Sequence, residues 1–420
     1  MFKKILPQST FAKNTLILLI GTSVAQAIPI AISPILTRIY SPEDFGVFTF
    51  FFSISSLIGV IATARYEMAI MIPKEKDDAV NILAFSSFIA LALGVITFLF
   101  SIIFFEPFSQ LFFKQTHSLY VYLIPIMITI LGLYQAFNYW SSRNKTFIKN
   151  SISRVSIALV TAIVSLSFGF YTKGPSGLII GLIIGQFVGV IILVWGNIKE
   201  WKYFMSVINL NKMKELIIKH KDFPLFNSFH AFLDILHNNI IIFFLDHYFL
   251  KSIVGYYGFT FRILKGPVGL IGSSTSQVFY QQAAIEAHER KNLSSRMWDI
   301  HKKLLIIGIP IFAIIAIFSP MVFSFIYGKE WKIAGDVARI ISPWLFLNFL
   351  TSPVSTITLI ANKQRQAVFL IIVDILLKVI GMFIAGIYGS YYLFFVLITI
   401  SSSCVLLFTL WWYYKIAKRF

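Results

Sequence analysis

Twelve long apolar runs, each bounded by charged or turn-forming residues, dominate the sequence. A helix needs roughly 20 apolar residues to cross the ~30 Å hydrocarbon core of a bilayer, and these runs are long enough. They lack the alternation of polar and apolar residues that marks the strands of a membrane β-barrel. We therefore predict an all-α polytopic membrane protein of about twelve transmembrane helices. The runs fall at residues 14–36, 45–72, 79–105, 118–138, 152–171, 176–196, 223–245, 252–282, 304–326, 338–359, 367–387 and 391–414.

The composition leaves no room for a large soluble domain. Of the 420 residues, 57% are hydrophobic and 13% are charged, whereas soluble domains carry about 25% charged residues. The net charge of +18 comes from basic residues scattered through short loops, so we expect no nucleic-acid partner. The single cysteine, Cys404, excludes an intrachain disulfide and a cysteine-based metal cluster.

The connecting segments indicate the orientation in the membrane. When they are assigned alternately to two sides, the side that holds both chain ends carries 25 Lys and Arg residues and the other side carries 7. Positive residues accumulate on the cytoplasmic side of membrane proteins. We therefore predict that both termini are cytoplasmic and that the number of spans is even.

The chain divides into two similar halves. The segment YSPEDFGVF before the second run, with Gly46, is echoed by FLKSIVGYY before the eighth, with Gly255, and the turn SSRNK at 141–145 is echoed by LIANKQR at 359–365. We predict two six-helix bundles around a central cleft, an arrangement typical of alternating-access transporters. The predicted parts are an N-terminal bundle, a cytoplasmic linker and a C-terminal bundle at 1–198, 199–222 and 223–420. Prolines suggest hinge or cavity segments at 27–34 and 265–267.

Ionisable residues inside the predicted spans are the main functional candidates. A lone charge at the centre of a span costs about 2.5–3.5 kcal/mol, so such residues pair with one another or face water. Arg262 and Lys265 lie three residues apart with no acid nearby in the sequence, which a structural role explains poorly. The candidates are Arg65, Glu67, Asp234, Arg262, Lys265, Asp374 and Lys378.

Other candidates have simpler interpretations. Arg65 and Glu67 lie close to Pro73 and could extend to the cytoplasmic interface, and Asp374 and Lys378, four residues apart, could neutralise each other. In the seventh run, polar residues form a stripe that we expect to line a wet or charged space. The stripe consists of Asn227, His230, Asp234, His237 and Asn238.

The sequence contains no pattern of a catalytic or metal site. It has no Walker loop, HExxH or GxSxG, and the i,i+7 spacing of His230 and His237 does not suit zinc. We expect no enzymatic activity, catalytic residue, metal or cofactor.

Three stretches together resemble the Wzx-type polysaccharide flippases, the O-antigen and capsule branch of the superfamily that also contains the MATE exporters. They are ISPILTRIYSPEDFGVF (33–48), ATARYEMAIMIPKEKDDA (62–79) and VGYYGFTFRILKGPVGLIGSSTSQVFYQQAA (254–284). The most specific matches are Arg65, Tyr66, Glu67 and Pro73 in the second stretch, and Arg262 and Pro267 in the third. The resemblance covers nearly the whole chain and implies a V-shaped MATE-like transporter.

The resemblance also implies a substrate and a location. Wzx-type proteins move undecaprenyl pyrophosphate carrying an oligosaccharide repeat unit from the cytoplasmic to the periplasmic leaflet of the bacterial inner membrane. Expected partners are this lipid-linked oligosaccharide, membrane lipids, and the polysaccharide polymerase and chain-length machinery. Guanidinium groups bind phosphate oxygens bidentately, so Arg262, Lys265, Arg65 and Arg38 are the expected pyrophosphate ligands. The expected sugar contacts are Asn227, His230, Asn238 and Tyr257.

The driving force has two candidate sources. Moving an anion out of a negative-inside cell releases about 2.3 kcal/mol per charge per 100 mV. Alternatively, an H⁺ or Na⁺ gradient drives transport, with Asp234, Asp374, Lys378 and Glu67 as ion-coupling or charge-paired residues.

Three rival functions are a MATE-like exporter of cationic drugs, a flippase for another polyprenyl lipid such as a peptidoglycan precursor, and a structural or polymerase subunit. A cationic-drug pump should have an acidic cleft, whereas the ionisable residues inside the spans include four basic and three acidic ones. A polymerase subunit would be expected to carry a large periplasmic loop.

Overall fold

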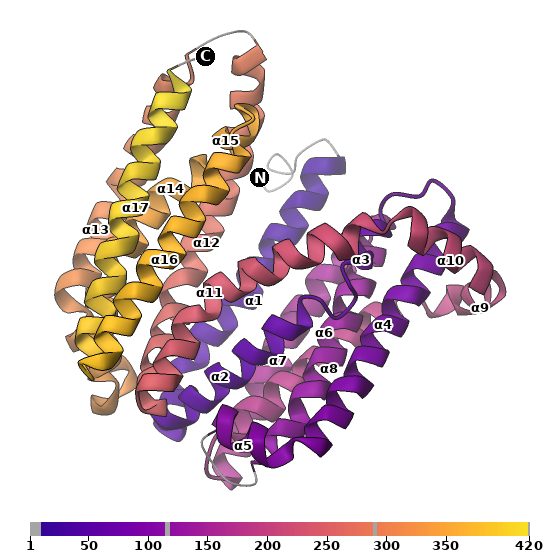
Figure 1. The fold of residues 1–420 in the computed structure, drawn as a ribbon, viewed down its shortest axis with the longest axis horizontal. Helices are drawn as coiled ribbons and strands as arrows, with labels where there is room; N and C mark the ends of the chain where they lie inside the picture. Colours follow the sequence, from indigo (N-terminus) through magenta and orange to yellow (C-terminus); the bar gives the residue numbers. More distant parts are fainter. Residues whose placement is uncertain (1–9, 114–117, 289–291, 419–420) are drawn as a thin grey trace, which may run out of the picture. The chain divides into compact units, whose positions relative to one another are not determined.

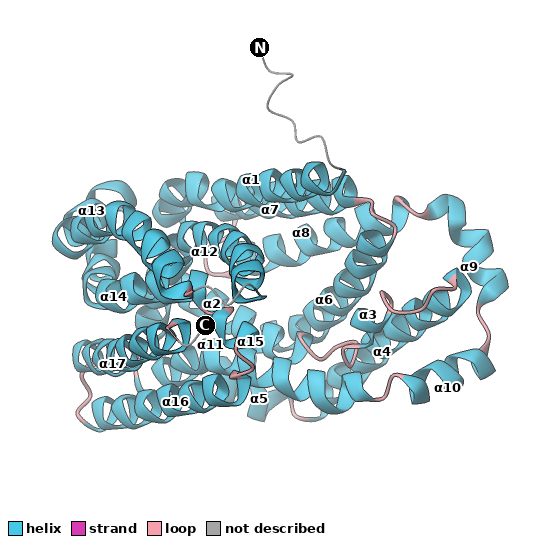
Figure 2. Cartoon of the chain, turned by 90° about the horizontal axis from the view of Figure 1, so that it is seen from above, coloured by secondary structure: helices cyan, strands magenta, loops and turns pink. Residues whose placement is uncertain are grey.

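A computed structural model of the chain describes residues 10–113, 118–288 and 292–418, and these residues form helices and turns without a strand (Figure 2). Contacts divide the chain into a first unit, Met1–Ile240, and a second unit, Ile241–Phe420. The predicted linker, 199–222, makes its contacts within the first unit. Some basic residues of the charge count lie outside the described residues, namely Lys3, Lys4, Lys114, Arg290, Lys291 and Arg419.

The first unit is built from long helices that pack side by side. α7 packs against both α1 and α8, and α4 packs against α6 (Figure 1). The last helix begins in the first unit and ends in the second. The elements are α1 (Thr10–Ile39), α2 (Pro42–Gly59), α3 (Tyr66–Ala69), α4 (Lys76–Ile103), α5 (Phe105–Phe113), α6 (Tyr120–Arg143), α7 (Phe147–Tyr171), α8 (Ser176–Trp195), η2 (Ile198–Glu200), α9 (Trp201–Val207), α10 (Leu210–Lys219), the π-helical turn η3 (Phe223–Asn227) and α11 (Ser228–Tyr248).

The second unit has the same kind of packing. α13 packs against α14, and α17 packs against both α14 and α16 (Figure 1). The elements are α12 (Lys251–His288), α13 (Leu293–Tyr327), η4 (Lys329–Trp331), α14 (Lys332–Thr351), η5 (Ser352–Val354), α15 (Ile357–Ile360), α16 (Gln364–Ile387) and α17 (Tyr391–Ala417).

The prediction of an all-α polytopic membrane protein is confirmed. Each of the twelve predicted runs coincides with helix, and among the described residues ten helical segments are long and apolar enough to cross a membrane. The two runs outside that set are those of α2 with α3 and of α12, which carry Arg65 with Glu67 and Arg262 with Lys265. α2 ends at Gly59, before Arg65 and Glu67, and carries Glu43 and Asp44 in its first turn. Arg262 and Lys265, in contrast, lie within α12 and lower its hydropathy. The cytoplasmic placement of the termini stays a prediction.

The two predicted turn echoes have the same backbone conformation. Lys145 and Asn362 both adopt a left-handed conformation, with φ of 56° and 55°. In the first turn the Lys145 and Thr146 amides donate to the carbonyls of Ser142 and Ser141, respectively. In the second turn the amides of Asn362 and Lys363 donate to the carbonyls of Leu359 and Thr358. This is the hydrogen-bond pattern of a Schellman helix end. The two turns therefore share one backbone geometry.

The segments predicted as hinges or cavity linings, 27–34 and 265–267, lie within continuous helices, and their role stays a prediction. α1 is helical through Pro29 and Pro34, and α12 is helical through Pro267. The interruptions lie elsewhere, at residues 60–65 between α2 and α3, at η3 and at η5. Two of these interruptions contain a proline, Pro224 and Pro353, but the first does not, so proline alone did not identify it.

Gly335 allows α13 and α14 to pack closely. A Cβ atom at this position would lie 2.5 Å from the Pro320 Cα and 2.6 Å from the Ser319 carbonyl oxygen, both of them backbone atoms. The Ser319 hydroxyl also donates to the Gly335 carbonyl at 2.8 Å. Small residues allow this approach of backbones in membrane bundles.

We predict that Gly335→Ala destabilises the second unit by about 1–3 kcal/mol, because the two helix backbones must separate. The thermal midpoint of the purified protein in detergent should fall. Gly269→Ala is the matched control, since no atom lies within 4 Å of its added Cβ and alanine favours helix. Equal midpoints for the two variants would contradict this packing.

Candidate functional site

The second span is interrupted at its end by an unwound stretch. α2 stops at Gly59, and after it Ala64 and Arg65 both adopt left-handed conformations, with φ of 49° and 61°. Residues other than glycine rarely adopt this conformation, which costs about 1–2 kcal/mol per residue. The Gly59 carbonyl accepts from the Ala62 amide at 3.2 Å and from the Gln135 side chain of α6 at 3.3 Å, so this carbonyl stays satisfied at the break in the span. We call residues 60–69 the Arg65 segment.

The Arg65 segment contains a buried ion pair. Arg65 Nη1 lies 3.2 Å from Glu67 Oε1, and the Thr63 hydroxyl donates to the other carboxylate oxygen. The Glu67 side chain is fully buried, whereas that of Arg65 is 20% exposed. A buried carboxylate needs this compensation because losing its hydration is costly. The guanidinium thus neutralises Glu67 while part of it stays accessible.

The linker, residues 199–222, forms a hydrogen bond with the Arg65 segment and helps to fix its position. The Tyr66 hydroxyl, on the residue between Arg65 and Glu67, donates to the Ile217 carbonyl of α10 at 3.1 Å. η3, which follows the linker, also packs against α3. Arg143 of α6 donates to the Ile70 carbonyl at 2.9 Å. The segment is therefore fixed by side chains that bond to backbone oxygens.

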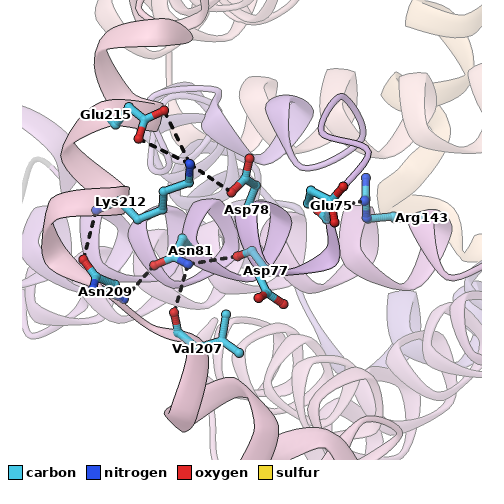
Figure 3. Close-up of polar contacts among 9 residues, drawn as sticks. All are labelled: Glu75, Asp77, Asp78, Asn81, Arg143, Val207, Asn209, Lys212 and Glu215. Carbon is cyan, nitrogen blue, oxygen red and sulfur yellow. Dashed lines mark hydrogen bonds and ion pairs between the residues drawn. The ribbon is translucent and has the colours of Figure 1, made fainter.

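Asn81 of α4 attaches the linker to the first unit (Figure 3). Its amide nitrogen donates to the Val207 carbonyl at 3.1 Å, and its amide oxygen accepts from the Asn209 backbone N–H at 2.8 Å. Beside it, Lys212 Nζ lies 3.6 Å from Asp78 and 3.3 Å from Glu215. Asn81 is only 1% exposed, so its bonds are shielded from competing water, whereas the lysine pairs are more exposed.

Two titratable side chains of the linker have shifted pKa values. The hydrogen bond from the Tyr203 hydroxyl to Asp77 raises the pKa of that tyrosine. Burial, together with the neighbouring Lys219, lowers the pKa of His220. At neutral pH the docked linker therefore holds a protonated tyrosine and a neutral histidine.

The basic residues predicted to bind pyrophosphate do not gather at one place within the first unit. Arg38 is exposed in the last turn of α1, just before α2 begins. Arg65 follows the far end of α2, and at 1.5 Å per residue the 18 residues of that helix separate the two by about 26 Å. Arg38 and Arg65 therefore lie at opposite ends of one span.

In the second unit, α12 presents Arg262 and Lys265 one turn apart on an exposed face. Lys265 Nζ lies 4.6 Å from the centre of the Phe261 ring, a cation–π distance. Tyr257 is different, because it is 1% exposed and stacks between Phe261 and Phe395 with ring centres 5.4 and 5.7 Å away. Its covered ring does not suit a sugar contact.

Asp374 and Lys378 of α16 form an ion pair, with Lys378 Nζ 2.5 Å from Asp374 Oδ2. The ammonium also lies 5.0 Å from the centre of the Trp344 ring of α14. Because Lys378 is only 4% exposed, this pair neutralises itself inside the bundle. Its geometry fits a structural role better than an ion-coupling one.

The polar stripe of the seventh run lies on η3 and α11. His230, Asp234 and Asn238 are exposed and follow one another at i,i+4, while Asn227 and His237 are half-buried. The Asn238 amide donates to the backbone carbonyl of Asp234 at 2.8 Å. The stripe is thus a polar face on a helix that also exposes Phe229 and Leu233.

Sequence reasoning missed three polar contacts. Asp246 and Lys251 form a buried ion pair across the turn from α11 to α12, and opposite charges five residues apart around a turn could have suggested it. His301 is buried and bonds to the Tyr414 hydroxyl at 2.7 Å and the Leu350 carbonyl at 3.1 Å. Neither this contact nor that of Asn81 has a local signal, because the partners are distant in sequence.

Comparisons with known proteins agree with this fold. Residues 35–336 match the model of a family described as polysaccharide biosynthesis proteins. No curated protein matches the sequence. An inward-facing MATE-family multidrug transporter of the MOP superfamily superposes with a TM-score of 0.69 at 15% identity, covering 95% of this chain and 94% of the other.

Two further solved structures have the same fold. The lipid II flippase MurJ, in an inward closed conformation, gives a TM-score of 0.65 at 17% identity, covering 96% of this chain and 89% of the other. A MOP-superfamily transporter from Pyrococcus furiosus, whose binding pocket is described as reversed in polarity, gives 0.62 at 14% identity, covering 96% and 95%. The chain therefore has the fold of these multi-pass membrane transporters.

The family match covers most of the chain, and it assigns the chain to a narrower class of proteins than the shared fold does. The chain belongs to the family of polysaccharide biosynthesis proteins.

We predict that Asn81→Ala loosens both the linker and the Arg65 segment, because it removes the hydrogen bonds to the Val207 carbonyl and the Asn209 amide, each worth about 0.5–1.5 kcal/mol. Hydrogen–deuterium exchange measured by mass spectrometry should increase in 201–219 and 60–70 and stay unchanged in the second unit. Lys214→Ala, on the exposed face of α10, is the control. Unchanged exchange at 60–70 would show that the linker does not support that segment.

Proposed function

We propose that this protein is a flippase of the bacterial inner membrane that translocates undecaprenyl-pyrophosphate-linked oligosaccharide repeat units to the periplasmic leaflet by alternating access. Membership of a polysaccharide biosynthesis family carries this proposal. A fold shared with MurJ, a lipid II flippase, and with MATE transporters supports it. The protein acts as a transporter rather than an enzyme, and it supplies the lipid-linked units to the polysaccharide polymerase and chain-length machinery.

The distribution of charge inside the spans suits an anionic headgroup. The ionisable candidates inside the spans include four basic and three acidic residues, and Arg262 and Lys265 lie one turn apart on an exposed face of α12. A pyrophosphate carries about two negative charges that need compensation away from water, and charge-assisted hydrogen bonds from guanidinium groups supply it. We assign this role first to Arg262 and Lys265, and then to the partly exposed guanidinium of Arg65.

The exposed polar stripe supplies neutral groups for sugar hydroxyls. Asn227, His230 and Asn238 offer amide and imidazole donors and acceptors on η3 and α11. The membrane potential favours outward movement of the anionic headgroup by about 2.3 kcal/mol per charge per 100 mV. Asp234, on the same face, is the carboxylate that we propose for coupling to an H⁺ or Na⁺ gradient.

Arg262→Ala should reduce surface polysaccharide at least about ten-fold in a deletion strain that expresses the variant, because one charge-assisted contact is worth about 1.5–3 kcal/mol. Arg262→Lys should restore part of the activity, and Lys332→Ala, an exposed lysine at the start of α14, should have no effect. The amount of protein in the membrane is measured in parallel. Normal polysaccharide with Arg262→Ala would remove the principal site, and altered drug resistance instead would favour an exporter.

If Asp234 couples transport to protons, Asp234→Asn should abolish the dependence of translocation on an imposed pH gradient in inverted membrane vesicles. Asp299→Asn, an exposed carboxylate on α13, should keep that dependence. A gradient response equal to that of the unchanged protein would exclude Asp234 and leave the membrane potential as the driving force.

A further inference from the structure

An exposed apolar stripe runs out of α8 and continues beyond the end of that span. On α8, exposed apolar side chains recur at helical spacing, at Ile184, Phe187, Ile191 and Trp195. We call the continuation through η2 and α9 the α9 stripe. It consists of Ile198, Trp201, Met205 and Ile208, which are 53%, 42%, 59% and 37% exposed.

The opposite side of α9 is fixed to the first unit. Phe204 is 4% exposed and meets the Trp140 ring of α6 edge-on, with ring centres 5.1 Å apart. On the same side Tyr203 donates to Asp77, and Lys76 Nζ lies 3.1 Å from Glu200. α9 therefore cannot rotate to bury its stripe, which faces away from the bundle.

Two members of the α9 stripe share one face of α9. Trp201 and Met205 lie four residues apart on this helix, about one turn. Ile198 precedes them in η2, and Ile208 follows directly after the end of α9. Lys202 is exposed and lies at the edge of this face. A narrow apolar face flanked by lysine is typical of a helix that lies flat in a membrane interface, where the lysine reaches the headgroups.

The charge of the linker favours an anionic surface. Residues 199–222 contain six lysines against Glu200, Glu215 and Asp222. Anionic lipids give the cytoplasmic leaflet a negative surface potential that attracts such basic segments near the end of a span. The α9 stripe is also continuous with the exposed apolar face of α8, which we expect to contact lipid.

We propose that α9 lies in the interface of the cytoplasmic leaflet, with the α9 stripe at the boundary of headgroups and acyl chains and Lys202 on anionic phospholipid headgroups. This surface is separate from the residues assigned to the transported substrate and does not depend on its identity. The linker is then anchored in two ways: Asn81 bonds it to the first unit, and the α9 stripe binds it to lipid.

Spin labels on single cysteines test the proposal in the full-length protein. Cys404→Ser removes the only cysteine, and Met205→Cys then places a label on the α9 stripe. Ile191→Cys on α8 and Lys214→Cys on α10 are the lipid and water references, and all three side chains are exposed, so folding should be preserved. Accessibility to oxygen and to a nickel chelate is measured in phosphatidylcholine vesicles with and without phosphatidylglycerol.

The label at 205 should lie about 5–10 Å into the headgroup and acyl boundary, between the two references. Adding Lys202→Glu should move it toward water in the anionic vesicles. Accessibility equal to that at 214 would overturn the interfacial position, and broadening between labels would assign the stripe to a second copy of the chain. An unchanged depth with Lys202→Glu in both kinds of vesicle would overturn the contact with anionic headgroups.

Discussion

Charge that enters a bilayer must be compensated, and this constraint explains the buried ion pairs of the structure. Glu67 is fully buried, and it is stabilised by Arg65 and by the Thr63 hydroxyl. The second unit contains two further compensated carboxylates: Asp374 pairs with Lys378, and Asp246 pairs with Lys251. In each case the two partners lie within five residues of each other, so the pair forms without depending on how distant helices are placed.

The compensation has different consequences for the two spans that carry the functional candidates. In the second span it requires an unwound backbone, because Arg65 reaches Glu67 from a left-handed residue after the end of α2. The eighth span stays helical through its charged residues and presents them on an exposed face. The unwound part of the second span is held by hydrogen bonds with α6 and α10. The charged residues of the eighth span are held in place by the unbroken helix α12.

Hydrophobicity and charge placement predicted the fold but not its interruptions. The twelve apolar runs coincide with helix because length and apolarity are local properties of the chain. Proline suggested hinges in α1 and α12, but both helices continue through these residues. In α1 the Ser33 hydroxyl donates to the Ile30 carbonyl, which Pro34 leaves without an amide partner. The real break at 60–65 depends on Gln135, Arg143 and Tyr66 meeting partners far along the chain. No local pattern could reveal those contacts, nor that Tyr257 is covered by Phe395.

The matching turns after α6 and α15 bear on how this chain relates to other proteins. Their left-handed residues are a lysine and an asparagine, so two different side chains adopt the same backbone geometry within one chain. Solved structures likewise superpose over nearly the full length at 14–17% identity. In an apolar environment many side chains satisfy the same helix packing, so one architecture accommodates widely different sequences.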